Sequence, residues 1–160
     1  MTEKTEIVVI GGGYAGVMAA NRLTGRADAV VTLINPRPRF VERIRRHQHL
    51  TGSHDAAVDF RTLLARPVRL TVDTVTAIDR ADRRLTLASG ATVRYDHLVY
   101  AVGSGSAAPT APGAAEHAYP LAELDQVERL RPVLDAAPPS GPLTVVGAGP
   151  TGIEVAAELA

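Results

Sequence analysis

Two glycine-rich stretches of one pattern constrain this chain more than any other feature. The first reads GGGYAG at residues 11–16, and the second reads GAGPTG at residues 147–152, so both match G-x-G-x-x-G. Each follows a short apolar run and precedes a run with helical apolar spacing. The pattern alone is weak, but a buried strand that ends in this turn and opens a helix is typical of parallel α/β folds. The chain is therefore expected to contain two such units within 160 residues.

Each glycine of the first turn meets a different physical requirement. Gly11 permits the sharp turn off the strand at residues 6–10, Gly13 lets a pyrophosphate approach bare backbone, and Gly16 lets the helix pack closely on the strand. The anion then meets N–H groups at the positive end of the helix dipole. We expect a dinucleotide phosphate to be bound by Gly11, Gly12, Gly13, Tyr14, Ala15 and Gly16.

The next predicted strand, residues 29–34, ends at Asn35. A dinucleotide fold usually places Asp or Glu here, to accept hydrogen bonds from the ribose hydroxyls. Asn35 still offers a carbonyl acceptor, but its bond to ribose is expected to be weaker because it carries no charge. Arg37 and Arg39 lie close by in the sequence and permit a second interpretation, a pocket that tolerates a 2′-phosphate. The first turn alone leaves the identity of its dinucleotide open.

The middle of the chain changes pattern twice. Residues 40–65 predict helical pieces broken near residues 51–53. Residues 68–100 predict short strands in a half-buried antiparallel meander, which leads into the apolar strand HLVYA. These features predict an α/β fold: a Rossmann-like domain with a parallel sheet plus a small antiparallel β meander, followed by the start of a second Rossmann unit.

The second half is expected to be less regular. Residues 103–120 predict an extended connection, and the helix that starts at Leu121 is expected to end or kink at Pro132. The run LTVV before the second turn predicts another buried strand. The predicted domains are 1–120 (the first nucleotide-binding domain), 121–140 (a connecting helix and linker) and 141–160 (the start of the second domain).

Composition excludes several classes of protein. Lys plus Arg and Asp plus Glu both number 17, so the basic excess of a nucleic-acid binder is missing. Cysteine is absent, which excludes disulfide scaffolds and Cys-ligated metal sites. His47, His49 and His54 lack the i, i+4 spacing of a helical zinc site, so we predict no metal. No apolar run is long enough to span a bilayer and the polar N-terminus is not a signal peptide, so the predicted location is the cytoplasm.

The second turn contributes Gly147, Gly149, Pro150, Thr151 and Gly152, with Glu154 two residues beyond it. One interpretation makes Glu154 a helix-start charge in a capping box with Thr151. The other places this carboxylate close to a bound nicotinamide ribose. The run EVAAELA reaches the last residue, Ala160, whereas a βαβ unit needs about 30 residues. We therefore expect the chain to be the N-terminal part of a longer protein.

The order of these motifs resembles the FAD/NAD(P)-binding pyridine nucleotide oxidoreductases, the two-dinucleotide-binding flavoproteins. The branch that it resembles most contains type II NADH dehydrogenases and apoptosis-inducing-factor-like NADH:quinone oxidoreductases. The resemblance covers nearly the whole chain and is carried by VVIGGGYAGVMAA, VTLINPRPRF, YDHLVYAVGS and VVGAGPTGIEVAAELA. The third stretch is the most discriminating, because family members have Ala-Thr-Gly where this chain has Ala101, Val102 and Gly103.

The resemblance implies two cofactors, FAD and NAD(P)H. It implies that residues 11–16 hold the FAD pyrophosphate and that Asn35 falls where the family usually has an acid on the adenosine ribose, with Pro36 as a further cofactor-binding residue. The strand ending in residues 101–103 would pass the flavin nucleotide. Val75 would offer its backbone to adenine, and Gln48 would border the FAD. The second turn with Glu154 would begin the NAD(P)H domain.

The resemblance also implies a reaction, hydride transfer from NAD(P)H to FAD followed by electron transfer to a quinone or another small-molecule acceptor. No residue here is a convincing acid, base or nucleophile, so we predict no catalytic residue. The missing cysteine pair excludes thiol–disulfide chemistry for these residues. A homo-oligomer and peripheral membrane attachment of a longer parent protein are compatible with this interpretation. The alternatives are a flavin monooxygenase-like enzyme and a non-catalytic, truncated nucleotide-binding module.

Overall fold

The computed structural model describes residues 4–105, 110–138 and 141–160, which form two compact units. Unit 1 comprises the described residues up to Phe40 together with Val58–Gly103. Unit 2 comprises Val41–Ala57 together with the described residues after Gly103. Each unit has buried apolar side chains of its own.

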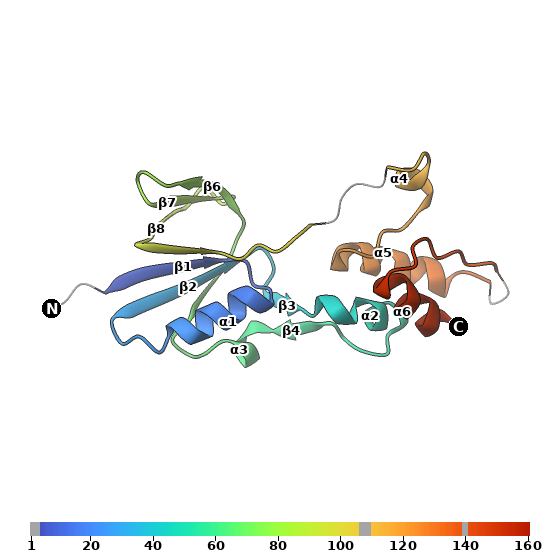
Figure 1. The fold of residues 1–160 in the computed structure, drawn as a ribbon, viewed down its shortest axis with the longest axis horizontal. Helices are drawn as coiled ribbons and strands as arrows, with labels where there is room; N and C mark the ends of the chain where they lie inside the picture. Colours follow the sequence, from blue (N-terminus) through green and yellow to red (C-terminus); the bar gives the residue numbers. More distant parts are fainter. Residues whose placement is uncertain (1–3, 106–109, 139–140) are drawn as a thin grey trace. The chain divides into compact units, whose positions relative to one another are not determined.

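A four-stranded parallel sheet in the order β5-β2-β1-β9 forms the centre of unit 1 (Figure 1). Its strands are β5 (Arg69–Val72), β2 (Ala29–Asn35), β1 (Thr5–Ile10) and β9 (His97–Tyr100). Residues 7–10 of the central strand are all β-branched and all buried, as expected for a strand covered on both faces. Because the four strands run parallel, their carboxyl ends lie along one edge of the sheet.

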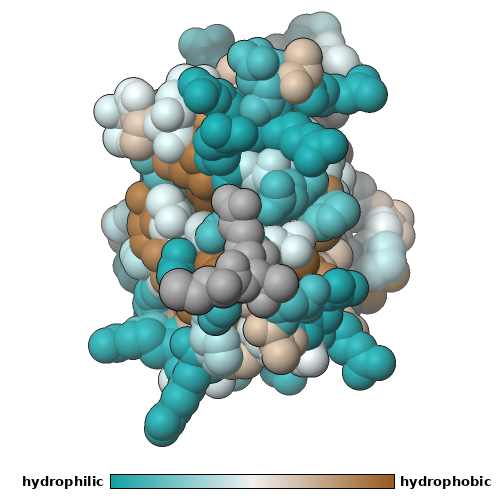
Figure 2. All heavy atoms as spheres, turned by 90° about the vertical axis from the view of Figure 1, so that its left-hand side faces the viewer, coloured by the Kyte–Doolittle hydropathy of each residue, from teal (hydrophilic) through white to brown (hydrophobic). Residues whose placement is uncertain are grey.

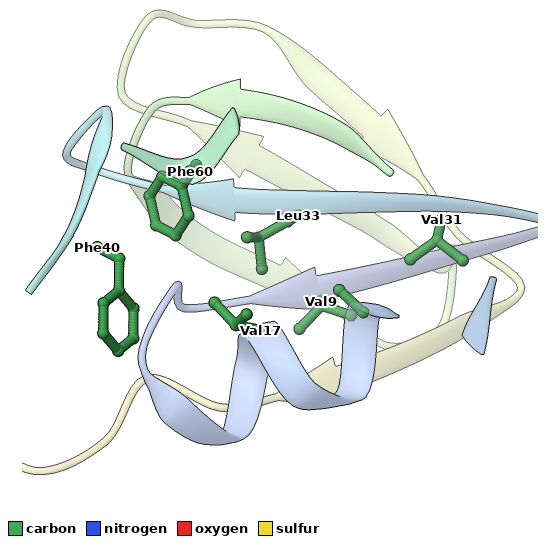
Figure 3. Close-up of a cluster of buried hydrophobic side chains, with 7 residues drawn as sticks. Val9, Val17, Val31, Leu33, Phe40 and Phe60 are labelled. Carbon is green, nitrogen blue, oxygen red and sulfur yellow. The ribbon is translucent and has the colours of Figure 1, made fainter. Parts of the chain in front are cut away.

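One face of this sheet is covered by helix α1 (Tyr14–Leu23). Figure 3 shows Val17 of the helix beside Val9 of β1, with Leu33 of β2 close by. Phe40 and Phe60 extend the same cluster, and their rings meet edge to face with centroids 6.5 Å apart. Aromatic rings bury large apolar areas, so this cluster is the main apolar support of the residues that follow β1.

The other face is covered by a three-stranded antiparallel sheet in the order β6-β7-β8 (Figure 1). Its strands are β6 (Val75–Asp79), β7 (Arg84–Leu87) and β8 (Thr92–Arg94). Leu85 and Leu87 are buried against the parallel sheet, whereas their neighbours in β7 are exposed. This alternation confirms the predicted half-buried meander. The α/β class, with a parallel sheet and a small antiparallel sheet, is likewise confirmed.

The structure differs from the predicted meander at its first strand. Residues 69–72 pair parallel with β2 and belong to the main sheet, and the antiparallel sheet begins only at Val75. Two further strands were not predicted, β3 (Arg39–Val41) and β4 (Ala57–Asp59), which form a small sheet and are followed by α3 (Phe60–Leu63). Strands of three residues are too short to show a hydrophobic period in the sequence.

Unit 2 is helical. It contains the 3₁₀ turn η1 (Arg43–Arg45) and helices α2 (Arg46–Thr51), α4 (Ala114–His117), α5 (Leu124–Asp135) and α6 (Pro150–Leu159). The predicted break near residues 51–53 is confirmed, because Gly52 ends α2 in the left-handed conformation with φ of 78°. Leu50 of α2, Val127 of α5 and Val155 of α6 form the buried centre, surrounded by leucines.

Two expectations for the second half differ from the structure. The helix expected from Leu121, with an end or a kink at Pro132, begins at Leu124 and does not end at Pro132, because α5 continues to Asp135. The helix loses one N–H donor at Pro132, but the carbonyl that this donor would have met belongs to Glu128, which is exposed to water. Residues 143–146 form no strand, and Val146 is 91% exposed. A strand needs a backbone partner, and no strand among the described residues pairs with this segment.

Within residues 4–105, 110–138 and 141–160, no helix combines the length and the apolar content needed to cross a membrane. The predicted extended connection at residues 103–120 includes the short helix α4, and its residues 106–109 lie outside the described part of the chain.

Candidate nucleotide-binding site

The chain turns sharply where β1 ends, and the turn needs glycine at its first position. Gly11 has a φ of +99°, a backbone conformation that residues other than glycine rarely adopt. Its N–H donates to the Ile34 carbonyl at 2.9 Å. A Cβ at Gly11 would lie 2.7 Å from the carbonyl carbon of Ala101. The ends of β1, β2 and β9 are therefore brought together around this glycine.

Gly16 sets how closely α1 packs on the exit of β1. A Cβ at Gly16 would overlap the Gly11 carbonyl oxygen and lie 3.0 Å from the Gly11 carbonyl carbon. Gly16 is buried inside α1, so no solvent gap can absorb a side chain there. The role predicted for Gly16, close helix–strand packing, is confirmed in the structure.

Gly13 differs from the other glycines of the turn because the space in front of it is open. It is exposed, and a Cβ built on it would meet no heavy atom within 4 Å. Gly13 is the N-cap of α1, with φ of −80° and ψ of −172°, and its residue type offers no side chain to cap the helix. Tyr14 and Ala15, the next two residues, are also exposed. An anion can therefore approach the positive end of α1 at this point.

The side-chain amide of Asn35 connects the glycine turn with the residues that follow β2. Its Oδ1 accepts a hydrogen bond from the Gly12 N–H at 2.8 Å, and its Nδ2 donates to the Arg37 carbonyl at 2.8 Å. Gly12 is buried, and a Cβ there would overlap the Phe60 ring. The sequence pointed to Asn35 as a ribose acceptor and contained no signal for these two backbone partners.

The neighbouring strand ends complete the same edge. Ala101 donates its N–H to the Ile10 carbonyl at 2.8 Å, Val102 is 48% exposed, and Gly103 has φ of +73°. At the end of β5, Asp73 donates its N–H to the Asn35 carbonyl at 3.0 Å. A hydrogen bond from the Ser89 side chain holds the pKa of the Asp73 carboxyl below its ordinary value. Val102 and Gly103 are therefore exposed residues of this edge, whereas the Asp73 carboxyl is engaged by Ser89 and by the Thr74 N–H.

Most residues of the predicted first site lie together at the carboxyl edge of the parallel sheet in unit 1. Pro36 is exposed directly after β2. Val75 is half-buried at the start of β6, where it pairs with Leu87. Gln48 lies in α2 of unit 2, where its Oε1 accepts a hydrogen bond from the Arg45 guanidinium at 3.0 Å. The residues that share the carboxyl edge are Gly11–Gly16, Asn35, Pro36 and Ala101–Gly103.

The second turn repeats the backbone geometry of the first. Gly147 has φ of +114°, and Gly149 caps α6 with φ of −76° and ψ of 174°. A Cβ at Gly152 would overlap the Gly147 carbonyl oxygen, as one at Gly16 would overlap that of Gly11. The space in front of Gly149 is open to 4 Å. Turn and helix form here although residues 143–146 are not a strand, so the geometry is local to the G-x-G-x-x-G stretch.

Glu154 does not take part in a capping box. The N-cap of α6 is Gly149, which has no side chain, so Thr151 does not hold the capping position. The Glu154 carboxylate instead lies 3.3 Å from Nδ1 of His47 in α2. His47 and Glu154 are 107 positions apart in the sequence, so no local sequence pattern predicts that they pair. The placement of Glu154 at a nicotinamide ribose stays a prediction.

The other histidines near α2 also face carboxylates. His49 Nδ1 lies 3.5 Å from Asp55, and His54 Nε2 lies 3.1 Å from Glu42. Among the residues that the structure describes, no group of three or more His, Cys, Asp or Glu side chains is arranged to hold a metal ion. The three histidines were also expected to lie on a solvated face, but the side chains of His47 and His49 are only 14% and 16% exposed, and each of the three lies beside a carboxylate.

A pocket of about 250 Å³ in unit 1 lies away from the glycine turn. Its lining comes from the first half of β1, from β9 and from the residues around the last turn of α1: Thr5, Ile7, Leu23, Arg26, His97 and Val99. The face drawn in Figure 2 is mixed, with hydrophilic side chains projecting and apolar residues visible between them. Open parallel sheets bind nucleotides at the carboxyl ends of their strands, so the glycine turn is the better candidate site.

Comparison with known proteins agrees with this geometry. The chain is 35% identical over 170 residues to an NADH dehydrogenase-like protein of Mycobacterium tuberculosis, covering 97% of this chain and 42% of the relative. It is 31% identical over 175 residues to a type II NADH:quinone oxidoreductase of the same organism, covering 96% and 38%. The chain thus spans about two fifths of the length of the curated relatives it matches.

Solved structures share the fold. The NADH:rubredoxin oxidoreductase of Clostridium acetobutylicum superposes with a TM-score of 0.75 at 20% identity, covering 98% of this chain and 42% of that one. The family model described as pyridine nucleotide-disulphide oxidoreductase matches residues 5–160, nearly the entire chain. The chain therefore belongs to the pyridine nucleotide-disulphide oxidoreductase family.

Proposed function

We propose that this chain binds FAD at the carboxyl edge of its parallel sheet, as the nucleotide-binding part of an NAD(P)H-dependent flavoprotein oxidoreductase. The family match and the NADH dehydrogenase-like relatives support this proposal. The observation that carries it is the open space in front of Gly13, at the exposed N-terminus of α1. Anions are stabilised where helix N–H groups and the helix dipole point at them.

Each part of the edge has a role in this proposal. The backbone of Gly11–Gly16 holds the pyrophosphate, and Asn35 and Pro36 border the adenosine ribose. Residues 101–103 line the path of the flavin nucleotide; Val102 stands where family members have Thr, which removes a hydroxyl but keeps the branched shape. Val75 offers its backbone to adenine, and Gln48 borders the FAD.

The second turn is proposed to begin the NAD(P)H site. Its similarity to the first turn in φ, in the close approach of Gly152 to Gly147 and in the open space at Gly149 supports this assignment. Glu154, Pro150 and Thr151 belong to the same site. The domain boundaries predicted from the sequence, after residues 120 and 140, are part of the same proposal.

The flavin, when bound, accepts hydride from NAD(P)H and passes electrons to an acceptor. The residues of this chain bind and orient it, and none is proposed as a catalytic acid, base or nucleophile. A quinone is the proposed acceptor, because one relative is a quinone oxidoreductase. A redox protein is the second possibility for the acceptor, because one structural neighbour is named for rubredoxin. Peripheral membrane attachment, a homo-oligomer and a cytoplasmic location belong to the same proposal.

Titration of the chain with FAD tests the proposal. We expect FAD to bind, ADP to compete with it, and riboflavin to compete poorly, because riboflavin lacks the pyrophosphate that Gly13 is proposed to receive. Flavin fluorescence or calorimetry measures the three affinities. Equal competition by ADP and riboflavin, or no binding of FAD, would contradict the proposal. In the full-length protein, anaerobic addition of NADH should bleach the flavin absorbance.

The second candidate is a nucleotide-binding module without catalytic activity. The unpaired residues 143–146 and the exposed Ile153 of α6 favour it, since both leave apolar surface uncovered in unit 2. Size-exclusion chromatography separates the candidates: a stable dimer without flavin supports the module, and a yellow monomer supports the flavoprotein.

A further inference from the structure

Both ends of the Asn35 side-chain amide are engaged by backbone groups, one in the first glycine turn and one just after β2. The Gly12 N–H donates to its Oδ1, and its Nδ2 donates to the Arg37 carbonyl, both at 2.8 Å. The side chain is partly buried, and its Cγ lies 2.8 Å from the position that a Cβ on Gly12 would occupy. Asn35 therefore packs against the glycine turn itself, between the turn and the residues that follow β2.

The chemistry of the two contacts requires a neutral amide. One contact needs an acceptor on the side chain, and the other needs a donor. An ionised carboxylate accepts from Gly12 equally well, but it cannot donate to Arg37 and sets a negative oxygen against that carbonyl. An Asp at this position, the residue type that usually meets ribose hydroxyls in dinucleotide folds, would break one of the two bonds.

We propose that Asn35 is a positioning residue, whose amide holds the Gly11–Gly16 turn in the shape that receives a pyrophosphate, and that it is not the acceptor for the ribose hydroxyls. The expected effect of Asn35 on cofactor affinity rests on the proposed function, the binding of FAD. The brace itself, the pair of hydrogen bonds to Gly12 and Arg37, is independent of any ligand.

The chain contains a matched control in the same unit. Asn21 of α1 makes the same kind of paired contact, donating from Nδ2 to the Leu63 carbonyl at 2.7 Å and accepting from the Ala65 N–H at 2.8 Å. It joins α1 to the last residue of α3 and to the segment that follows, and neither of these hydrogen bonds involves the glycine turn. Substitutions of Asn21 therefore remove an equivalent brace without touching the proposed site.

The experiment compares Asn35→Ala and Asn35→Asp with Asn21→Ala and Asn21→Asp in the full chain. Hydrogen exchange of the Gly12 amide, followed by NMR, reports the brace without ligand. We expect exchange roughly tenfold faster in Asn35→Ala, about unchanged in Asn35→Asp, which keeps an acceptor, and unchanged in both Asn21 variants. Thermal unfolding of each variant verifies that it is folded.

FAD affinity then reports positioning. We expect the Kd for FAD to rise roughly tenfold in both Asn35 variants and to stay within about twofold in both Asn21 variants. Tighter binding in Asn35→Asp would overturn the proposal, because a ribose acceptor gains from charge. Unchanged Gly12 exchange in Asn35→Ala would also overturn it. If the unsubstituted chain binds no FAD, the proposed function fails, and Gly12 exchange still decides whether the brace exists.

Discussion

Gly13→Ala separates binding from stability in the first turn. The backbone at Gly13, with φ of −80° and ψ of −172°, is open to any residue, and the added methyl would meet no atom within 4 Å. Removing glycine from the unfolded chain stabilises the fold by about 0.4–1 kcal/mol. Ala is a poorer N-cap than Gly, which destabilises α1 by a similar amount, about 0.5–1 kcal/mol. The free energy of unfolding should therefore change by less than about 1 kcal/mol.

FAD binding should respond very differently to the same substitution. The methyl occupies the open space through which a pyrophosphate would reach the N–H groups of α1. A hydrogen bond to a charged group contributes about 1.5–3 kcal/mol, and 1.4 kcal/mol corresponds to a factor of ten. Losing one such bond should weaken FAD binding by roughly tenfold to a hundredfold. Urea unfolding and FAD titration of the same sample measure both quantities.

Gly25→Ala is the control for this comparison. Gly25 follows the other end of α1, and a Cβ there would lie 3.4 Å from the Arg22 carbonyl oxygen, an ordinary contact. The Gly25→Ala variant should bind FAD with the same affinity as the unsubstituted chain. If Gly13→Ala binds FAD as tightly as Gly25→Ala, the pyrophosphate does not approach Gly13 and the reasoning is refuted.

Three further predictions concern the support of this edge. Gly16→Ala should lower the free energy of unfolding by at least about 1–3 kcal/mol, because its methyl overlaps the Gly11 carbonyl and forces α1 away from β1; an unchanged urea midpoint would argue against this packing. Phe60→Ala should lower the free energy of unfolding by about 3–5 kcal/mol, since Phe60 is fully buried. A decrease of less than about 1 kcal/mol, measured by thermal unfolding, would contradict the assigned core. Hydrogen bonds from the Arg61 side chain and backbone lower the pKa of Asp59 from 3.8 to about 2. The stabilisation from ionised Asp59 is therefore present above pH 3.8 and is lost as the pH falls towards 2. A carbon-detected NMR titration should show the Asp59 pKa moving towards 3.8 in Arg61→Ala, and an identical titration curve would refute the pairing.

Local sequence patterns were sufficient for the parts of the site that are built from neighbouring residues. The two G-x-G-x-x-G stretches form the same turn and helix start, even though residues 143–146 do not pair as a strand. Glycine stereochemistry and helix periodicity act over a few residues, so one sequence window contains all the information they need. The buried β1 and the alternating β7 were predicted for the same reason.

The tertiary structure decided everything that depends on a partner far along the chain. Asn35 looked like a weakened ribose acceptor in the sequence, and only the fold shows that the backbone N–H of Gly12, 23 positions away, donates to its side-chain oxygen. His47 and Glu154 meet across 107 positions, and residues 69–72 leave the predicted meander because β2 offers them a parallel edge. By itself the sequence determined the glycine turns and the α/β class. Hydrogen-bond partners and strand pairing were left to the tertiary structure, because a donor or a strand edge is satisfied by whichever group the folded chain brings to it.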